Sequence, residues 1–278
     1  MNHLNSMTPD NSFLINGQAN TGLSVLDRGL AYGDGVFRSF AVKNGVPHQW
    51  ALQYQKLAAD CQALNIQCPS AEILLKDIQA LFGANEYAVA KIIVTRGEGV
   101  RGYGFPADIM PNRIVIKSAA PNYPEKNATA GVCLHLCELR LSHQAKLAGI
   151  KHLNRLENVL ARNEWSDASI ADGILLDLEG NVIEGTMSNV FARFGTTLTT
   201  PALNQCGVSG LARERILSYV PALGLQANIQ NLPLAVMMQA DEIIICNSLF
   251  GAWQAVDFNG KQWPKQTLAQ QLTNMLMV

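Results

Sequence analysis

The stretch Leu147-Ala148-Gly149-Ile150-Lys151-His152-Leu153-Asn154-Arg155-Leu156-Glu157-Asn158 is the part of the chain from which the rest is interpreted. Lys151 directly precedes leucines at helical spacing, Leu153, Leu156 and Leu160, which predict a helix. This places the lysine at a junction between elements and not on a solvated helix face. Burial of a lysine disfavours its charged form, and a neutral amine can form a Schiff base with an aldehyde. The alternative is an ordinary surface lysine.

Length and composition exclude several classes of protein. With 278 residues, 48% of them hydrophobic, the chain is long enough for two modest domains. The formal net charge of −1 and the lack of a polybasic run give no electrostatic footprint for nucleic acid or an acidic membrane surface. Met1–Asn11 lacks the features of a signal peptide, and no window reaches the length of a membrane span. We therefore expect a cytoplasmic location.

The cysteines favour reduced thiols over a metal site. The six cysteines are scattered, as reduced core thiols would be, at Cys61, Cys68, Cys133, Cys137, Cys206 and Cys246. Cys133, His135 and Cys137 alternate and would share a face of a strand. A zinc site requires a fourth ligand and usually a CxxC pair, so a half-buried strand is the favoured interpretation and no metal is expected.

The first half predicts alternating strands and helices. Asn16-Gly17 and Asn44-Gly45 are typical of tight hairpin turns, and Gly33 and Gly35 flank Asp34 in either a turn or a close backbone approach. Apolar spacing predicts strands at 12–15, 36–42, 87–95 and 113–119, and helices at 50–64 and 71–82. Residues 120–127 are polar with two prolines and are predicted to link a domain 1–119 to a domain 128–278.

The glycine-rich run after the third predicted strand matches the pattern of a dinucleotide-binding motif but lacks the helix that such a motif requires. Gly97-Glu98-Gly99-Val100-Arg101-Gly102 matches GxGxxG, but such a fingerprint must open a helix. Tyr103-Gly104-Phe105-Pro106 follows, with Pro111 close behind, so no helix can form. Arg96 and Arg101 on this loop suit bidentate recognition of a carboxylate, or are solvated loop charges.

The second half supplies two further candidate site elements. Glu184 ends the second strand of a hairpin that spans 174–184, where a carboxylate could hold a pyridinium nitrogen or simply face water at a sheet edge. Gly207-Val208-Ser209-Gly210 opens a predicted helix, a natural seat for phosphate. The apolar strand 241–246 ends in Asn247-Ser248, whose hydroxyl could cap the same phosphate.

A reactive lysine, a strand-end glutamate and a phosphate-seating helix are the parts needed to hold pyridoxal phosphate. With them the chain resembles the fold-type IV pyridoxal-phosphate enzymes, the class IV aminotransferase family, from Leu14-Ile15-Asn16-Gly17 to Cys246-Asn247-Ser248. This family includes branched-chain and D-amino-acid aminotransferases and 4-amino-4-deoxychorismate lyases. The segment 148–157, and Arg96-Gly97 with Arg101-Gly102-Tyr103, are most similar to the lyase branch. Leu156 and Phe37 replace tyrosines of the branched-chain and D-amino-acid enzymes, respectively.

The resemblance implies an α/β (α+β) fold with a small N-terminal α/β domain and a larger C-terminal pseudo-barrel domain. Lys151 would form the Schiff base with the cofactor, and Glu184 would pair with its pyridine nitrogen. The cofactor phosphate would be held by the backbone at Val208 and Ser209, by the Ser248 hydroxyl and by Lys56. Most members carry arginine where this chain has Lys56, which is otherwise typical of a solvated helix face. Arg101 would bind a substrate carboxylate, and Ser39 would make a weaker polar contact.

The implied activity is conversion of 4-amino-4-deoxychorismate to p-aminobenzoate and pyruvate on the route to folate, by a homodimer. Lys151 would act first as general base at ring carbon 4 and then as proton donor to the leaving enolpyruvate. One alternative is an aminotransferase of the same fold acting on D- or branched-chain amino acids. Remote alternatives are a non-catalytic protein that retains the fold and a dehydrogenase built on the run Gly97 to Gly102.

Overall fold

The computed structural model describes residues 12–19, 21–84 and 86–277. By its internal contacts the chain divides into two compact units. The first unit extends to Asn122 and also includes His152–Asn154, whereas the second comprises Tyr123–Lys151 and continues from Arg155. The N-terminal stretch Met1–Asn11, used above to argue against a signal peptide, lies outside the described residues. Within the described part of the chain, every helix is too short or too polar to cross a membrane.

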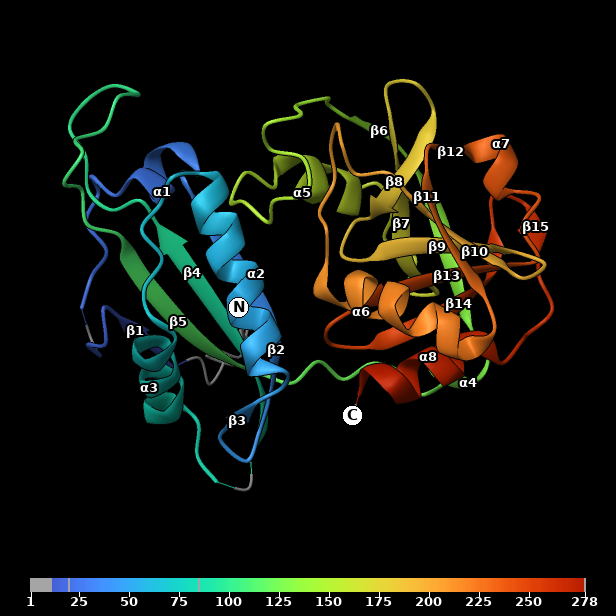
Figure 1. The fold of residues 1–278 in the computed structure, drawn as a ribbon, viewed down its shortest axis with the longest axis horizontal. Helices are drawn as coiled ribbons and strands as arrows, with labels where there is room; N and C mark the ends of the chain where they lie inside the picture. The colour runs from blue at the N-terminus through green and yellow to red at the C-terminus, as the bar shows by residue number, and fades with distance from the viewer. Residues whose placement is uncertain (1–11, 20, 85, 278) are drawn as a thin grey trace, which may run out of the picture. The chain divides into compact units, whose positions relative to one another are not determined.

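The first unit is built on a five-stranded sheet that is antiparallel throughout (Figure 1). Its order is β1 (Phe13–Ile15), β5 (Asn112–Ala119), β4 (Tyr87–Thr95), β2 (Gly35–Lys43) and β3 (Val46–Pro47). Both predicted turns are present, because Asn16 and Gly17, and likewise Asn44 and Gly45, all have positive φ as a type I′ turn requires. The second turn joins β2 to β3, whereas β1 pairs with the distant β5.

Helices cover one face of this sheet (Figure 1). α1 (Arg28–Tyr32) is short, α2 (Trp50–Ala63) packs on β2, and α3 (Ala71–Leu81) packs on β5 and β1. Alternation along β2 buries Val36, Phe40 and Val42 on the helix side, where Leu57 of α2 is also buried. The helices predicted at 50–64 and 71–82 are thus confirmed to within one residue.

The second unit contains a ten-stranded mixed sheet. Its main path runs β11-β10-β9-β13-β14-β6-β7-β8-β12, with β15 paired to β14. The bounds are β6 (Val132–Leu141), β7 (Ile170–Asp177), β8 (Asn181–Gly185), β9 (Asn189–Phe194), β10 (Thr197–Pro201), β11 (Gln226–Gln230), β12 (Leu232–Pro233), β13 (Glu242–Asn247), β14 (Gly251–Phe258) and β15 (Lys261–Gln262). Because β8 also contacts β9 and β10, the sheet curls back on itself as a pseudo-barrel.

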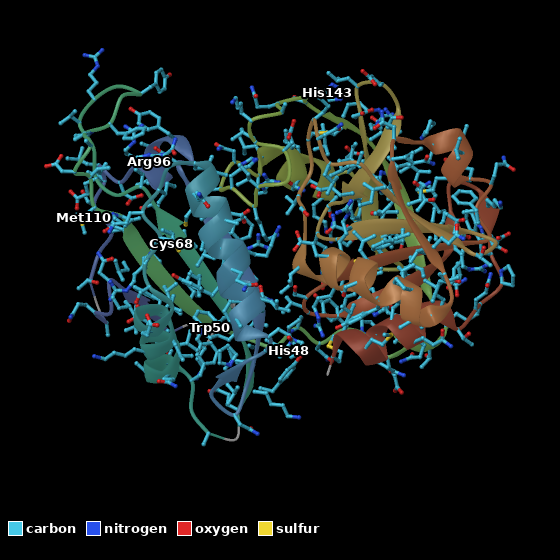
Figure 2. All side chains as sticks on the ribbon, viewed as in Figure 1. His48, Trp50, Cys68, Arg96, Met110 and His143 are labelled. Atoms are coloured by element: carbon cyan, nitrogen blue, oxygen red, sulfur yellow. The ribbon has the colours of Figure 1, made fainter. Side chains whose placement is uncertain are left out.

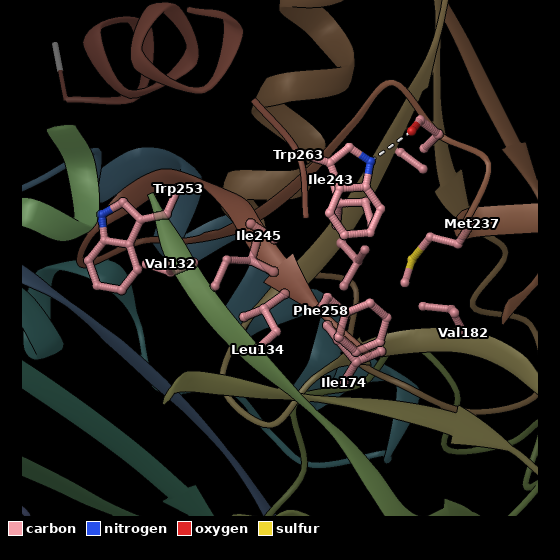
Figure 3. Packing of buried hydrophobic residues seen from close by; sticks show 14 of the residues in the cluster. Val132, Leu134, Ile174, Val182, Met237, Ile243, Ile245, Trp253, Phe258 and Trp263 are labelled. Atoms are coloured by element: carbon pink, nitrogen blue, oxygen red, sulfur yellow. Dashed lines mark hydrogen bonds between the residues drawn. The ribbon is translucent and has the colours of Figure 1, made fainter. Parts of the chain in front are cut away.

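Apolar clusters fill both sides of this sheet, and two of them meet at β13. Ile243 and Ile245 of β13 point into one cluster, with Ile174, Phe258 and Trp263, whose indole N–H donates to the carbonyl of Ala240 at 2.8 Å (Figure 3). The alternate residues of β13, Ile244 and Cys246, point into the other cluster, which packs against α6 and α8. The remaining helices are α4 (Lys126–Thr129), α5 (Leu156–Arg162), α6 (Leu211–Tyr219), the 3-10 turn Val220–Leu223, α7 (Leu234–Met237) and α8 (Leu268–Leu276).

Several sequence predictions are refined by the fold. The helix after Lys151 begins only at Leu156, and its leucines Leu156 and Leu160 are 74% and 60% exposed. Helical spacing therefore predicted the helix but not a buried face. α4 begins at Lys126, inside the predicted linker, and the domain limits 1–119 and 128–278 stay a proposal. No helix occurs between Thr95 and Asn112, all of them described residues, which confirms that the glycine-rich run lacks the nucleotide-binding geometry.

The alternating Cys133, His135 and Cys137 lie on β6, as predicted. His135 contacts the Glu164 carboxylate at 3.3 Å and packs on the Trp165 ring, whereas Cys137 is buried in an apolar cluster. Across the described residues, no three His, Cys, Asp or Glu side chains gather in a way that could hold a metal ion.

Candidate active site

Glu184 is a buried carboxyl group at the end of β8. The β7–β8 hairpin turns at Gly180, whose φ of 82° favours glycine, and brings Glu184 to a position where its side chain is only 3% exposed. Its Oε2 accepts a hydrogen bond of 2.7 Å from the backbone N–H of Val208. Burial raises the pKa of Glu184 to about 7, against the opposing effects of the Arg155 charge, the Val208 N–H, the Lys151 charge and the Asn158 side chain. The group is thus an acid that titrates near neutral pH.

Lys151 is held near this carboxyl group by a short ladder of backbone hydrogen bonds. Gly149 forms a parallel bridge with Val208, in which the Gly149 N–H donates to the Gly207 carbonyl at 2.9 Å and the Ser209 N–H donates to the Gly149 carbonyl at 3.0 Å. Lys151 follows two residues later and is half-buried. Its charge acts on Glu184, which places the two side chains in one electrostatic environment.

The predicted phosphate donors Val208 and Ser209 lie in the loop just before α6, and their role stays a prediction. The N–H groups of Val208 and Ser209 are already bound to Glu184 and to the Gly149 carbonyl. Helix α6 begins at Leu211, and the first N–H groups of a helix have no intrahelical acceptor. The backbone N–H groups of Leu211, Ala212 and Arg213 therefore have no helical acceptor, and they lie at the positive end of the helix dipole. The sequence argument counted the preceding loop as the start of the helix.

Asn189 fixes the start of α6 to the sheet. Its side chain is buried at the first residue of β9, donates to the Val208 carbonyl at 2.8 Å and accepts from the Gly210 N–H at 3.1 Å. A side chain at Gly210 would collide with this amide, so glycine is required there. Asn189 of β9 is the antiparallel partner of Cys246 on β13, and Ser248 lies two residues after Cys246. The Ser248 hydroxyl and the start of α6 consequently lie at the same end of the sheet.

A second carboxyl group, Asp172, immobilises the turn that follows Glu184. Asp172 is fully buried and accepts hydrogen bonds from the Thr186 N–H and hydroxyl, at 3.0 and 2.6 Å, and from the Ser188 hydroxyl at 2.6 Å. The Asn158 side chain donates to the Thr186 carbonyl at 3.1 Å from the other side. Because these groups are satisfied without solvent, the turn presents Glu184 in one fixed orientation.

Sequence reasoning did not identify four of these supporting residues. Arg155 and Asn158 lie in the lysine stretch, four and seven residues after Lys151, and only that spacing could have pointed to them. Asp172 and Asn189 each lie on a mainly apolar strand, where a polar residue signals a specific hydrogen-bond partner.

The predicted site residues of the first unit occupy three different settings. Lys56 is half-buried on α2, Ser39 is half-buried on β2 opposite Lys91, and Arg101 is exposed on the glycine-rich loop. Arg96, the other loop arginine, is buried and donates to Asp34 and to the carbonyls of two residues after α2. Arg96 is therefore committed to the fold, whereas the roles of Lys56, Ser39 and Arg101 stay predictions.

Asp34 anchors the glycine-rich loop. Its Oδ2 accepts from the Arg28 Nε at 2.9 Å and from the Arg96 Nε at 2.8 Å. Arg28 also donates to the carbonyls of Gly102, Tyr103 and Gly104 on the loop. Burial alone would raise the pKa of Asp34, but hydrogen bonds from the two guanidinium groups hold it below its usual value. The Gly33-Asp34-Gly35 segment therefore forms a turn, and it also lets the backbone come close to the arginines that hold the glycine-rich loop.

Comparison with known proteins identifies the family. Residues 35–257 match the family described as amino-transferase class IV, and the chain belongs to this family. It is similar to the aminodeoxychorismate lyase of Vibrio harveyi, with 34% identity over 240 residues that cover 86% of this chain and 88% of that protein. It is also similar to the crystal structure of 4-amino-4-deoxychorismate lyase from Pseudomonas aeruginosa, with a TM-score of 0.90, 42% identity and coverage of 95% and 97%.

A more distant structure shares the fold alone. The PLP-bound form of a hypothetical aminotransferase from Mycobacterium tuberculosis superposes with a TM-score of 0.78 at 18% identity, covering 97% of this chain and 99% of that chain. The family match and the similar structures confirm the predicted fold class, a fold-type IV enzyme with a smaller α/β part and a larger pseudo-barrel part.

Proposed function

We propose that the protein is a pyridoxal-phosphate-dependent lyase that converts 4-amino-4-deoxychorismate to p-aminobenzoate and pyruvate. The observation that carries the proposal is the half-buried Lys151 beside a buried Glu184 whose pKa is about 7, at the end of the sheet where α6 begins. Support for the lyase branch comes from similarity to proteins named as that lyase over most of both chains.

The residues of the second unit fit the cofactor group by group. An aldehyde requires an amine, which Lys151 offers, and a pyridine nitrogen requires an acid, which Glu184 offers. A phosphate requires N–H and hydroxyl donors. The resemblance assigns the backbone at Val208 and Ser209 and the Ser248 hydroxyl to it, and the adjoining first turn of α6 adds N–H groups that have no helical acceptor. Lys56 would add a positive charge, although without the fork geometry of arginine. When bound, the cofactor supplies an electron sink for the carbanion formed at the substrate.

The chain's own groups would then move and hold protons. The Lys151 amine takes the proton from ring carbon 4 of the substrate and returns one to the departing enolpyruvate. Glu184 keeps the pyridine nitrogen protonated, since a buried carboxyl group with a pKa near 7 can share a proton with that nitrogen. Arg155 and Asn158 stabilise the ionised form of Glu184. We assign the substrate carboxylate to Arg101 and a weaker polar contact to Ser39.

We further propose that the enzyme is a cytoplasmic homodimer on the route to folate, with a domain boundary at 120–127. The composition, without a polybasic run, supports the location, and the resemblance to fold-type IV enzymes supports the dimer. Analytical ultracentrifugation of the cofactor-loaded protein tests the dimer, and a monomer at micromolar concentration would contradict it.

The activity is tested by mixing the cofactor-loaded protein with aminodeoxychorismate and measuring pyruvate with a lactate dehydrogenase coupling. We expect pyruvate and p-aminobenzoate in equal amounts without any keto-acid acceptor, and no product with Lys151→Ala. Lys146→Ala, an exposed lysine five residues upstream, is the matched control and should keep the activity. Amino transfer that depends on a keto acid, with no pyruvate released from aminodeoxychorismate, would identify an aminotransferase instead.

A further inference from the structure

Two cysteines of the first unit lie in contact although they are separated along the chain. Cys61, on the last turns of α2, is fully buried, and Cys68 follows the helix and is half-buried alongside it (Figure 2). The chain reverses between them, because Asn65 adopts a left-handed φ of 53° and the Ile66 N–H donates to the Cys61 carbonyl at 2.8 Å. This reversal brings the two thiols within hydrogen-bonding contact.

The reversal is held in place by groups from elsewhere in the unit. Arg96 donates to the carbonyls of Leu64 and Asn65, both at 2.8 Å, inside the segment that joins the two cysteines. Tyr54 lies two helical turns before Cys61, and its hydroxyl donates to the carbonyl of Pro69 at 3.2 Å. Because the backbone is fixed on both sides of Cys68, its sulfur stays beside Cys61.

The two thiols are chemically unequal. The hydrogen bond from the Cys61 thiol lowers the pKa of Cys68, although burial partly opposes it. The same contact, together with burial and the nearby Asp60 carboxylate, raises the pKa of Cys61. Cys68 is therefore the thiol that ionises first, and it is also the one that solvent reaches.

The other cysteines, all of them described residues, lack this arrangement. Burial raises the pKa of Cys137, Cys206 and Cys246 to about 12 in each case. Cys133 is half-buried like Cys68, but burial and the carboxylates of Asp257 and Asp167 raise its pKa. Cys133 therefore serves as a comparison within the same protein. Its exposure is similar to that of Cys68, but its pKa is shifted in the opposite direction.

We propose that Cys61 and Cys68 form a peroxide-oxidisable dithiol, in which Cys68 reacts first and Cys61 resolves it to a disulfide. The Cys68 thiolate attacks one oxygen of hydrogen peroxide, the O–O bond breaks, and sulfenic acid and hydroxide form. The Cys61 sulfur then attacks the Cys68 sulfur, the S–O bond breaks, and water leaves with the thiol proton. Two thiols are oxidised by two electrons and one peroxide is reduced to water.

The full-length protein tests this directly, because both cysteines fall on one tryptic peptide, 57–76, with no lysine or arginine between Lys56 and Lys76. After treatment with about one equivalent of peroxide and blocking with N-ethylmaleimide, this peptide should lose two hydrogens and carry no label. The peptide 127–140, which contains both Cys133 and Cys137, should carry the label on Cys133. In wild-type protein treated in the presence of dimedone, the adduct should appear on Cys68.

Two variants complete the test. Cys68→Ser should abolish fast consumption of peroxide, whereas Cys133→Ser should leave it unchanged. Iodoacetamide should label Cys68 in the untreated protein roughly tenfold faster than Cys133 at neutral pH. Equal labelling of the two cysteines, a dimedone adduct on Cys133, or oxidation of Cys68 to sulfinic acid without the linkage to Cys61 would each overturn the proposal.

Discussion

The buried Glu184 predicts an unusual pH dependence for the stability of the cofactor-free protein. Its pKa of about 7 in the folded state lies above the ordinary value of 4.5. Between these two values the folded protein binds more protons than the unfolded chain, so the free energy of unfolding falls as the pH rises through this window. At about 1.4 kcal/mol per pKa unit, the full effect is about 3 kcal/mol.

The perturbation is Glu184→Gln, which removes the titration and keeps the shape of the side chain. Urea denaturation of the cofactor-free wild type and variant at pH 5 and pH 8 gives four free energies of unfolding. Carboxyl groups common to both proteins, such as the buried Asp172, cancel in the comparison. Because pH 5 already lies above the ordinary pKa, we expect the wild type to lose about 2–3 kcal/mol more than the variant between the two pH values.

Glu179→Gln is the matched control, because Glu179 lies exposed in the turn of the same hairpin. This variant should follow the wild type at both pH values. If Glu184→Gln showed the same pH dependence as the wild type, burial would not raise the pKa of Glu184. The assignment of Glu184 as an acid poised near neutral pH would then be refuted.

Three further changes test other parts of the structure. Lys151→Ala should eliminate the visible absorbance of the bound cofactor and its trapping by borohydride, and retention of both would show that another amine carries the aldehyde. Asp34→Asn should destabilise the protein by about 3–5 kcal/mol in urea because two buried guanidinium groups lose their carboxylate, whereas Asp108→Asn on the exposed loop should have little effect. Lys56→Arg should tighten cofactor binding in a fluorescence titration. An unchanged affinity would show that Lys56 does not contact the phosphate of the cofactor.

The hydrogen bonds around Glu184 connect it to both neighbouring site elements. Val208 uses its N–H for the carboxylate of Glu184 and its carbonyl for the side chain of Asn189, and it bridges to Gly149 just before Lys151. A single loop residue thus ties the lysine segment, the acid and the start of α6 together. Substitutions that distort this loop should therefore affect binding of the aldehyde, ring and phosphate of a cofactor together.

The amino-acid sequence determined the local elements of this protein. Alternation defined β2 and β4, Asn-Gly pairs defined the two turns, and Pro106 with Pro111 excluded a helix after the glycine-rich run. These features depend on residues within one or two turns of each other, so a linear pattern is enough to predict them. The lysine motif, the strand-end glutamate and the predicted helix after Gly207 together indicated the family, which the comparisons confirm.

Tertiary structure alone decided which group each polar atom binds and how deeply it is buried. The pairing of Asp34 with Arg96 joins residues 62 positions apart, and that of Glu184 with Val208 joins residues 24 positions apart. Neither the pKa of Glu184 nor the occupied N–H of Val208 has a local signal, because both depend on what the whole fold places around them. The exposed leucines of α5 follow the same rule, since periodicity describes a helix face but not what covers it.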